Sequence, residues 1–163
     1  MSASKKIVLI GHFGVGKTSL MRRFIDNAFS EDYKVTLGVQ VKKKLVTLAN
    51  GNSVSLIIWD LEGNTTVEKT RPSYLLGANA FIYVFDATRT DTFKDLNSEV
   101  NFLDKNYPNA ITKVIGNKMD LINDESLNDI MRVKKIKYNY LTSAKTGDNV
   151  DTMFQELASE LLS

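Results

Sequence analysis

The sequence has no cysteine, only two prolines and a single histidine among its 163 residues. The absence of cysteine excludes disulfides, thiolate metal sites and thiol nucleophiles, and it suits a reducing cytoplasm. No apolar run approaches the length of a membrane span, and residues 1–6 lack the apolar centre of a signal peptide. We therefore expect a cytoplasmic protein whose chemistry relies on oxygen and nitrogen groups.

The sequence also lacks a marked excess of one charge. Its 21 Lys and Arg residues against 19 Asp and Glu give a net charge of +2, with no block of five like charges. The composition therefore indicates no nucleic-acid partner. There is no C-terminal cysteine for a prenyl group, so membrane contact is expected only through a partner or a missing tail. The length predicts one domain over residues 1–163, which we expect to be monomeric.

Hydrophobic patterning predicts strands that alternate with helices. Apolar and β-branched runs predict six strands, at residues 5–10, 39–48, 53–60, 80–86, 111–116 and 136–141. Between the second and third runs, Asn50 and Gly51 form a hairpin signal, so these two strands should be antiparallel. The other strands should be parallel, in an α/β domain with helices on both faces of the sheet.

Apolar residues at helical spacing predict the helices. One helix should begin at Lys17, and a second should end before Pro108. A short helix is expected over residues 124–131, and a closing helix should be capped near Asp148 or Asn149. The second helix has an apolar face made of Phe93, Leu96, Val100 and Leu103, and the closing helix has one made of Val150, Phe154, Leu157 and Leu161.

A glycine-rich loop at residues 11–18, the phosphate loop, joins the first predicted strand to the first helix. Its sequence has the spacing Gly-x-x-x-x-Gly-Lys-Thr, which in this context is typical of phosphate binding. The glycines allow backbone N–H groups to point inward, and the helix N-terminus adds unpaired donors and a positive dipole end. Lys17 should reach the outer phosphates, and the Thr18 hydroxyl is a suitable oxygen ligand for Mg²⁺.

Two further segments, the base loops, follow the fifth and sixth predicted strands. The first is Asn-Lys-Met-Asp at residues 117–120, and the second is Thr-Ser-Ala-Lys at residues 142–145. The Asp120 carboxylate can accept hydrogen bonds from a purine with both an N1–H and a 2-amino group, which is guanine. Adenine offers neither donor, so a buried Asp120 would remain unpaired beside it. The loops therefore predict a guanine site.

A sensor for the terminal phosphate is predicted at the end of the third strand. Asp60 is expected to bind Mg²⁺ through water, and the Gly63 N–H could meet the γ-phosphate. Thr36, on the loop before the second strand, could complete the metal site only when that phosphate is present.

With these motifs in order, the chain resembles the small GTPases of the Ras superfamily, and most closely the Rab branch. The Rab resemblance rests on two segments, Thr-Leu-Gly-Val-Gln at residues 36–40 and Pro-Ser-Tyr-Leu-Leu-Gly-Ala at residues 72–78. It implies a three-layer G domain, a GTP/GDP switch with Mg²⁺ and a role in signalling, with two switch loops, one around Thr36 and one at residues 62–76. The nucleotide-binding residues are then Gly11, Phe13, Gly14, Val15, Gly16, Lys17, Thr18, Ser19, Phe29, Tyr33, Thr36, Gly63, Asn117, Lys118, Asp120, Ser143, Ala144 and Lys145.

Two positions depart from the family pattern and bear on catalysis, which we assign to Lys17, Gly63 and residue 64. The family places a glutamine at residue 64 to orient the attacking water, but here Asn64 is one methylene shorter. Phe13 stands where the family favours glycine or a small polar residue, and its ring could obstruct Asn64 and an activating arginine. We expect slow hydrolysis and intact binding.

Several alternatives remain beside the slow switch. Phe13 and Asn64 would also suit a scaffold that keeps nucleotide without turnover, whereas Asp120 opposes a P-loop ATPase or kinase. His12 is expected to face solvent, and the three lysines at residues 42–44 to protect an exposed strand edge. By resemblance, effectors would meet the switch loops and the apolar triad Val41, Trp59 and Tyr74, and exchange or activating proteins are further possible partners.

Overall fold

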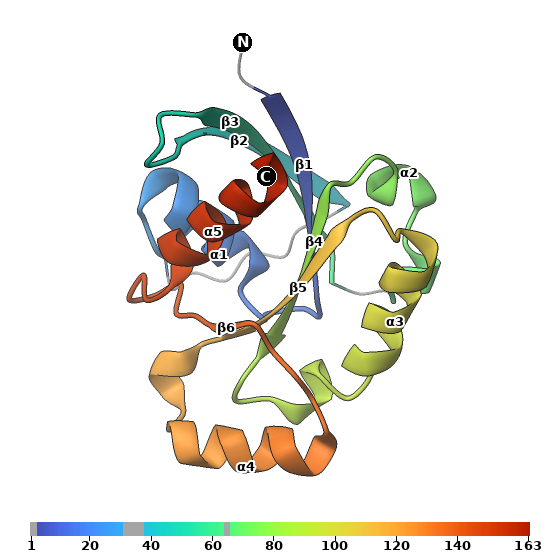
Figure 1. The fold of residues 1–163 in the computed structure, drawn as a ribbon. Coiled ribbons are helices and arrows are strands. Elements are labelled where there is room, and N and C mark those ends of the chain that lie inside the picture. The colour runs from blue at the N-terminus through green and yellow to red at the C-terminus, as the bar shows by residue number, and fades with distance from the viewer. Residues whose placement is uncertain (1–2, 31–37, 64–65) are drawn as a thin grey trace.

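The computed structural model describes residues 3–30, 38–63 and 66–163 (Figure 1). Six strands form one sheet in the order β2-β3-β1-β4-β5-β6. β2 pairs with β3 in the antiparallel sense, and every other neighbouring pair is parallel, as the sequence predicts. The strands are β1 Ala3–Ile10, β2 Val39–Thr47, β3 Ser53–Leu61, β4 Ala80–Asp86, β5 Ile111–Asn117 and β6 Tyr140–Leu141.

Helices cover both faces of this sheet and make the three layers visible in Figure 1. On one face, α1 (Lys17–Asp26) and α5 (Val150–Leu162) enclose a core in which the rings of Phe24 and Phe154 stack 4.1 Å apart. On the other face lie α2 (Pro72–Leu75), α3 (Leu96–Asn106) and α4 (Asp124–Lys134), over a second core. Three short 3₁₀ helices are η1 (Val67–Lys69), η2 (Thr90–Thr92) and η3 (Met119–Leu121).

The β2–β3 hairpin turns where Asn50-Gly51 predicts it. The Leu48 N–H donates to Asn52 O at 2.7 Å, and Gly51, at φ +87°, occupies the left-handed region that favours glycine. β2 is an edge strand, as the edge-protecting interpretation of its lysines requires, and Lys42 and Lys43 are exposed. Lys44 instead donates to the carbonyl of Phe24 and lies over the Phe24 ring.

Local capping explains several helix boundaries. The Asn123 Oδ1 accepts a hydrogen bond from the Ser126 N–H at 2.7 Å and so begins α4. Asn149 is the N-cap of α5, as expected, but its side chain donates to Leu141 O instead of capping the helix. α3 ends at Asn106, before Pro108, as predicted.

The sixth strand is shorter than predicted, because only Tyr140–Leu141 pairs with β5. The residues before it follow the end of α4 directly, and the Ile136 N–H donates back to Met131 O at 2.9 Å. Asn139 then bonds Val114 through its side chain as well as its backbone, which interrupts a regular ladder. The prediction of a strand over 136–141 was therefore wrong at its start, and α4 extends to Lys134 beyond the expected 131.

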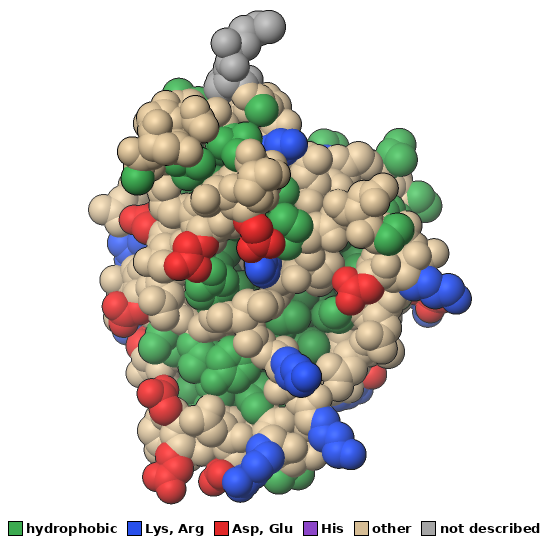
Figure 2. All heavy atoms as spheres, viewed as in Figure 1, with side chains coloured by type: hydrophobic (Ala, Val, Ile, Leu, Met, Phe, Trp, Pro, Cys, Tyr) green, Lys and Arg blue, Asp and Glu red, His purple; other side chains and the backbone are tan. Residues whose placement is uncertain are grey.

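The surface carries charges of both signs. Figure 2 shows Lys, Arg, Asp and Glu side chains dispersed over this face, with apolar side chains gathered between α5 and α4. Within the described residues, no helix has the length and apolar character needed to cross a bilayer.

Candidate functional site

A cavity of about 320 Å³ lies where the phosphate loop meets the two base loops. It is lined by most of the described residues that the sequence predicts for nucleotide binding. Gly11, Val15 and Ser143 do not line it, but they bond the lining side chains of Lys17, Asn117 and Asp120. Tyr33, Thr36 and Asn64 lie outside the described residues.

Lys17 is enclosed by the phosphate loop. Its Nζ donates to the carbonyls of Gly11 at 3.0 Å and His12 at 3.2 Å, and the residue is only 6% exposed. Burial lowers the pKa of Lys17 to about 8, and the nearby Asp60 carboxylate opposes that shift. A buried cation of this kind is suited to an anionic ligand, which would compensate the desolvation of the ammonium. His12, expected to face solvent, is half-buried.

Two glycines are required where the site is closely packed. Gly16 adopts φ +101° directly before α1, and a Cβ there would lie 2.2 Å from Asn117 Nδ2. A Cβ on Gly63 would lie 2.5 Å from the backbone of both His12 and Phe13. The segment after β3 therefore lies in close contact with the phosphate loop backbone.

Thr18 and Asp60 meet beneath the cavity. The Thr18 hydroxyl donates to Asp60 Oδ2, and the Asp60 side chain is fully buried at the end of β3. Paired hard oxygen atoms, one of them a buried carboxylate, are the donor set that a Mg²⁺ ion shared with phosphates prefers. These two residues therefore fit the predicted metal.

Asn117 joins the phosphate loop to both base loops. Its Nδ2 donates to Val15 O at 2.9 Å, while its Oδ1 accepts from the Thr142 hydroxyl at 3.1 Å and the Ala144 N–H at 3.2 Å. Asn117 is 2% exposed, so each of these bonds is shielded from water. The two base loops and the phosphate loop are therefore positioned as one unit.

Asp120 and Lys118 have their own partners in the base loops. The Ser143 hydroxyl donates to Asp120 Oδ1 at 2.8 Å, which orients the carboxylate at the cavity. A buried Asp120 was expected from the sequence, but the residue lies within the 3₁₀ turn after β5 and is exposed at the rim. Lys118 Nζ pairs with Asp86 Oδ2 at 3.0 Å, which fixes its stem along the cavity wall.

The opposite rim carries Phe13, whose side chain lines the cavity and is 39% exposed. Arg89 Nη2 donates to the Phe13 carbonyl at 3.1 Å and so holds the loop that carries the ring. Nearby, the Glu62 N–H donates to Gly38 O at 2.9 Å, and the Gly38 N–H donates back to Glu62 Oε2 at 3.3 Å. The two predicted switch segments are therefore bonded to each other where they leave the sheet.

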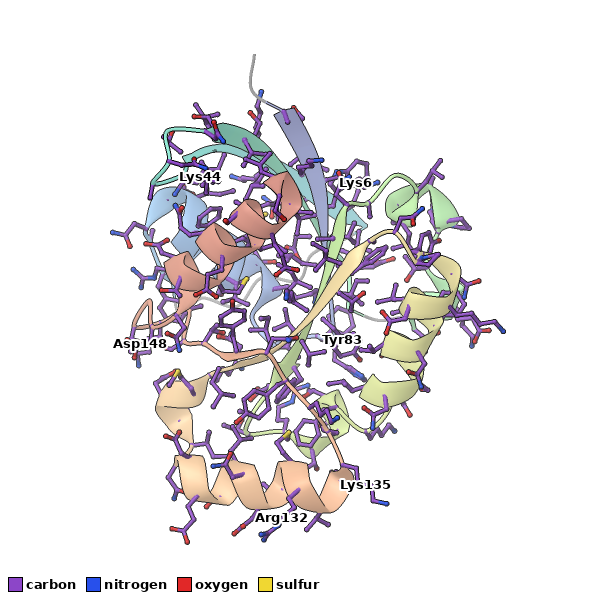
Figure 3. All side chains as sticks on the ribbon, in the orientation of Figure 1. Lys6, Lys44, Tyr83, Arg132, Lys135 and Asp148 are labelled. Atoms are coloured by element: carbon purple, nitrogen blue, oxygen red, sulfur yellow. The ribbon has the colours of Figure 1, made fainter. Side chains whose placement is uncertain are left out.

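The three residues of the predicted effector triad lie near one another. Val41 on β2 is opposite Trp59 on β3, and the rings of Trp59 and Tyr74 are 6.3 Å apart. Val41 is 47% exposed, and the two aromatic residues are half-buried. Lys6, labelled in Figure 3, places its Nζ 3.8 Å from the centre of the Trp59 ring and donates to Leu76 O at 2.9 Å. Partial burial lowers the pKa of Lys6.

Sequence reasoning missed several residues of the site. Arg22, Ser30 and Leu121 also line the cavity. Lys6 and Arg23 make contacts that hold neighbouring segments in place. Arg22 and Arg23 lie on α1, and the bonds of Arg23 to Ala144 and Lys145 join segments remote in sequence. Leu121, directly after Asp120, offered a local signal, since an apolar side chain beside a base loop can cover a purine ring.

Comparison with known proteins identifies the family. The family model described as Ras family matches residues 6–163. Ras-related protein Rab-18-B of Danio rerio is 37% identical over 163 residues, covering 96% of this chain and 78% of that protein. Ras-related protein Rab-30 of Homo sapiens is 37% identical over 164 residues, covering 97% and 80%. Rab-5B of Plasmodium falciparum is 34% identical over 163 residues, covering 97% and 78%. The chain therefore belongs to the Ras family and is a Rab-like small GTPase, a GTP-binding switch protein.

Proposed function

We propose that the protein binds GTP and GDP with Mg²⁺ in the 320 Å³ cavity and hydrolyses GTP slowly. The observation that carries this proposal is the continuity of the cavity from buried Lys17 to Asp120, because one ligand would have to satisfy both ends. A nucleotide with phosphates at the loop and a guanine at Asp120 has that chemistry. The switch segments would signal the presence or absence of the γ-phosphate of that nucleotide to partners.

Guanine selectivity would come from the base loops. Asp120 would accept from the N1–H and the 2-amino group, and the Ala144 N–H would face the 6-oxo group. Lys118, Lys145 and Phe29 also line the cavity and would enclose the ring. Pairing of a charged carboxylate with two donors is worth about 1.5–3 kcal/mol for each bond, so a purine without them is strongly disfavoured.

Mg²⁺ would be held by Thr18, by Thr36 and, through water, by Asp60. When bound, it would neutralise phosphate charge and help to orient the phosphates. Lys17 would contribute a second positive charge, and its burial means that this charge acts with little screening by water. The Gly63 N–H would bond the γ-phosphate and so connect the presence of that group to the switch segment 62–76.

Slow turnover would follow from Phe13 and Asn64. Phe13 lies on the cavity rim, and its backbone N is in close approach to Gly63, the residue before Asn64. A phenyl ring at this point would compete for space with the attacking water and with an incoming arginine. An activating arginine is worth roughly 10³–10⁵ in rate, so its exclusion would leave the GTP form long-lived.

Single-turnover hydrolysis of bound GTP tests this proposal, with Phe13→Gly and Asn64→Gln compared with the parent chain. We expect intact GTP binding in all three and faster hydrolysis in both variants. If none of the three hydrolyses GTP, and hydrogen exchange of the switch segments is identical with GDP and a non-hydrolysable GTP analogue, the scaffold reading replaces the switch. Preference of the parent for GDP over ADP tests the guanine site separately.

We further propose that effectors bind the triad Val41, Trp59 and Tyr74 together with the switch segments. Support comes from the proximity of the three residues and from the cation–π contact of Lys6 with the Trp59 ring. Trp59→Ala should abolish effector binding, measured against GTP-loaded protein whose melting temperature stays near that of the parent. Unchanged binding by a folded Trp59→Ala variant would disprove this surface.

A further inference from the structure

Arg23, in the last turn of α1, makes an unusual set of backbone contacts. Its Nε donates to Ala144 O at 2.8 Å, and its Nη2 donates to Lys145 O at 2.6 Å. Its Nη1 donates to the Asn27 side chain at 3.2 Å. One guanidinium therefore bonds two consecutive carbonyls of the second base loop as well as the end of its own helix.

The geometry requires an arginine. The Nε and one Nη of a guanidinium form a planar fork that can donate two parallel bonds, whereas a lysine ammonium acts as a point charge. Gly147, at φ +89°, lets the chain turn beside the stem: a Cβ there would lie 3.7 Å from Arg23 Cδ. The loop that leads into α5, marked by Asp148 in Figure 3, therefore passes beside the Arg23 side chain at Gly147.

The Ala144 residue is held from two opposite sides. Its N–H points to Asn117 Oδ1 at 3.2 Å, on the cavity side, and its carbonyl accepts from Arg23, on the α1 side. Asn117 connects this residue to the phosphate loop through Val15 O, and Arg23 connects it to the helix that begins at Lys17. Rotation of this part of the loop would break bonds on both sides.

We propose that Arg23 is a positioning residue for the purine: it fixes the backbone at Ala144 and Lys145 so that the Ala144 N–H, shared with Asn117 Oδ1, also faces the 6-oxo group of guanine. This inference rests on the proposed function, since it assumes that the cavity holds a guanine nucleotide. Arg23 itself does not touch the ligand. Its effect passes through the second base loop, and it links that loop to the helix that starts at the phosphates.

The test compares Arg23→Met and Arg23→Lys with the parent chain, and uses Arg132→Met as the matched control. Arg132 lies on α4, where its side chain is 79% exposed and pairs only with Asp129 in the contacts described. Each protein is loaded with GDP or with 6-thioguanosine diphosphate, which keeps both donors for Asp120 but replaces the 6-oxo oxygen with a poorly accepting sulfur. Dissociation rates are measured with Mg²⁺, and melting temperatures are recorded.

Arg23→Met should release GDP about 10–100 times faster, the loss expected when a charge-assisted contact is removed. Arg23→Met should release the 6-thio analogue only a few times faster than the parent does. The ratio of the dissociation rate of the analogue to that of GDP should therefore be smaller in the variant than in the parent. Arg23→Lys, which keeps the charge and can bond only one carbonyl well, should fall between it and the parent. Arg132→Met should match the parent with both nucleotides.

A purely structural role for Arg23 predicts a different pattern. The inference is overturned if both nucleotides are released faster by the same factor, or if Arg23→Lys behaves as the parent does. If Arg23→Met does not fold, the Arg23→Lys comparison decides the question. Failure of the proposed function would look different again, because the parent itself would then show no preference for GDP over ADP.

Discussion

The two sides of the cavity are held in place by different means. On the base side, Asn117 makes three buried hydrogen bonds, and Ser143 and Arg23 add bonds to Asp120 and Ala144. On the switch side, the described part of the segment 62–76 is bonded to the rest of the chain at Glu62, Val67 and Leu76. The base side thus has a dense polar network, whereas the described part of the switch side is fixed at a few points.

One of these few points is Glu99 on α3. Its Oε1 accepts from the Val67 N–H at 3.0 Å, and its Oε2 accepts from the hydroxyl of Tyr83. Tyr83, labelled near the centre of the sheet in Figure 3, is fully buried, and burial together with Glu99 raises its pKa. The Glu99–Tyr83 pair therefore anchors the switch segment to the sheet without contacting the predicted nucleotide site.

The largest expected effect lies on the base side. Asp120→Asn replaces one acceptor oxygen with a donor that opposes the N1–H and 2-amino groups of guanine. Loss of two charge-assisted bonds, at about 1.5–3 kcal/mol each, should weaken GDP binding by roughly 10²–10⁴-fold. Competition titration against labelled GDP measures it, with Asp124→Asn, exposed at the start of α4, as the control. A loss below tenfold would contradict the assignment of Asp120 to the base.

The second-largest effect is expected when Glu99, which bonds both Val67 and Tyr83, is removed. Glu99→Ala removes the acceptor of both Val67 N–H and Tyr83 O–H, and each of these groups is buried. We expect a loss of about 2–4 kcal/mol in the free energy of unfolding, since each unsatisfied donor costs about 1–3 kcal/mol. Exchange of the Val67 amide should accelerate, while that of the Ala144 amide and the affinity for GDP should change little.

Glu99→Gln is the matched variant for that experiment, because it retains one acceptor oxygen in nearly the same volume. It should lose about half as much stability as Glu99→Ala. If Glu99→Ala weakened GDP binding as strongly as Asp120→Asn, the base side and the switch side of the cavity would not be held independently.

These two regions also differ in how far the sequence predicts them. The base loops follow strands β5 and β6, and their residues are adjacent in sequence, so a local motif is enough to place Asn117, Asp120 and Ala144. The sheet order follows similarly, because alternating strands and helices restrict the possible topologies. The antiparallel β2–β3 pair is confirmed by its register from Val39 to Thr47.

Contacts between segments that are remote in sequence have no local motif that would predict them. Glu99 and Tyr83 are 16 residues apart, and Arg23 and Ala144 are 121 apart, so no local spacing relates the partners. A glutamate on a helix with a mostly polar surface is indistinguishable in sequence from one that faces solvent. The predicted start of the sixth strand was wrong for a related reason: Ile136 is buried directly after α4, and burial alone does not distinguish a strand from the end of a helix.

The smallest effect is expected when only the Tyr83 hydroxyl, which donates to Glu99, is removed. Tyr83→Phe keeps the buried ring and removes only the hydroxyl, so Glu99 loses one donor and keeps the Val67 N–H. Because Glu99 is half-buried and can hydrate its Oε2, we expect a loss of about 1 kcal/mol in the free energy of unfolding. Urea unfolding measures it, and exchange of the Val67 amide should stay within about threefold of the parent. Equal effects of Tyr83→Phe and Glu99→Ala on that amide would mean that Glu99 reaches the switch segment only when Tyr83 orients its carboxylate.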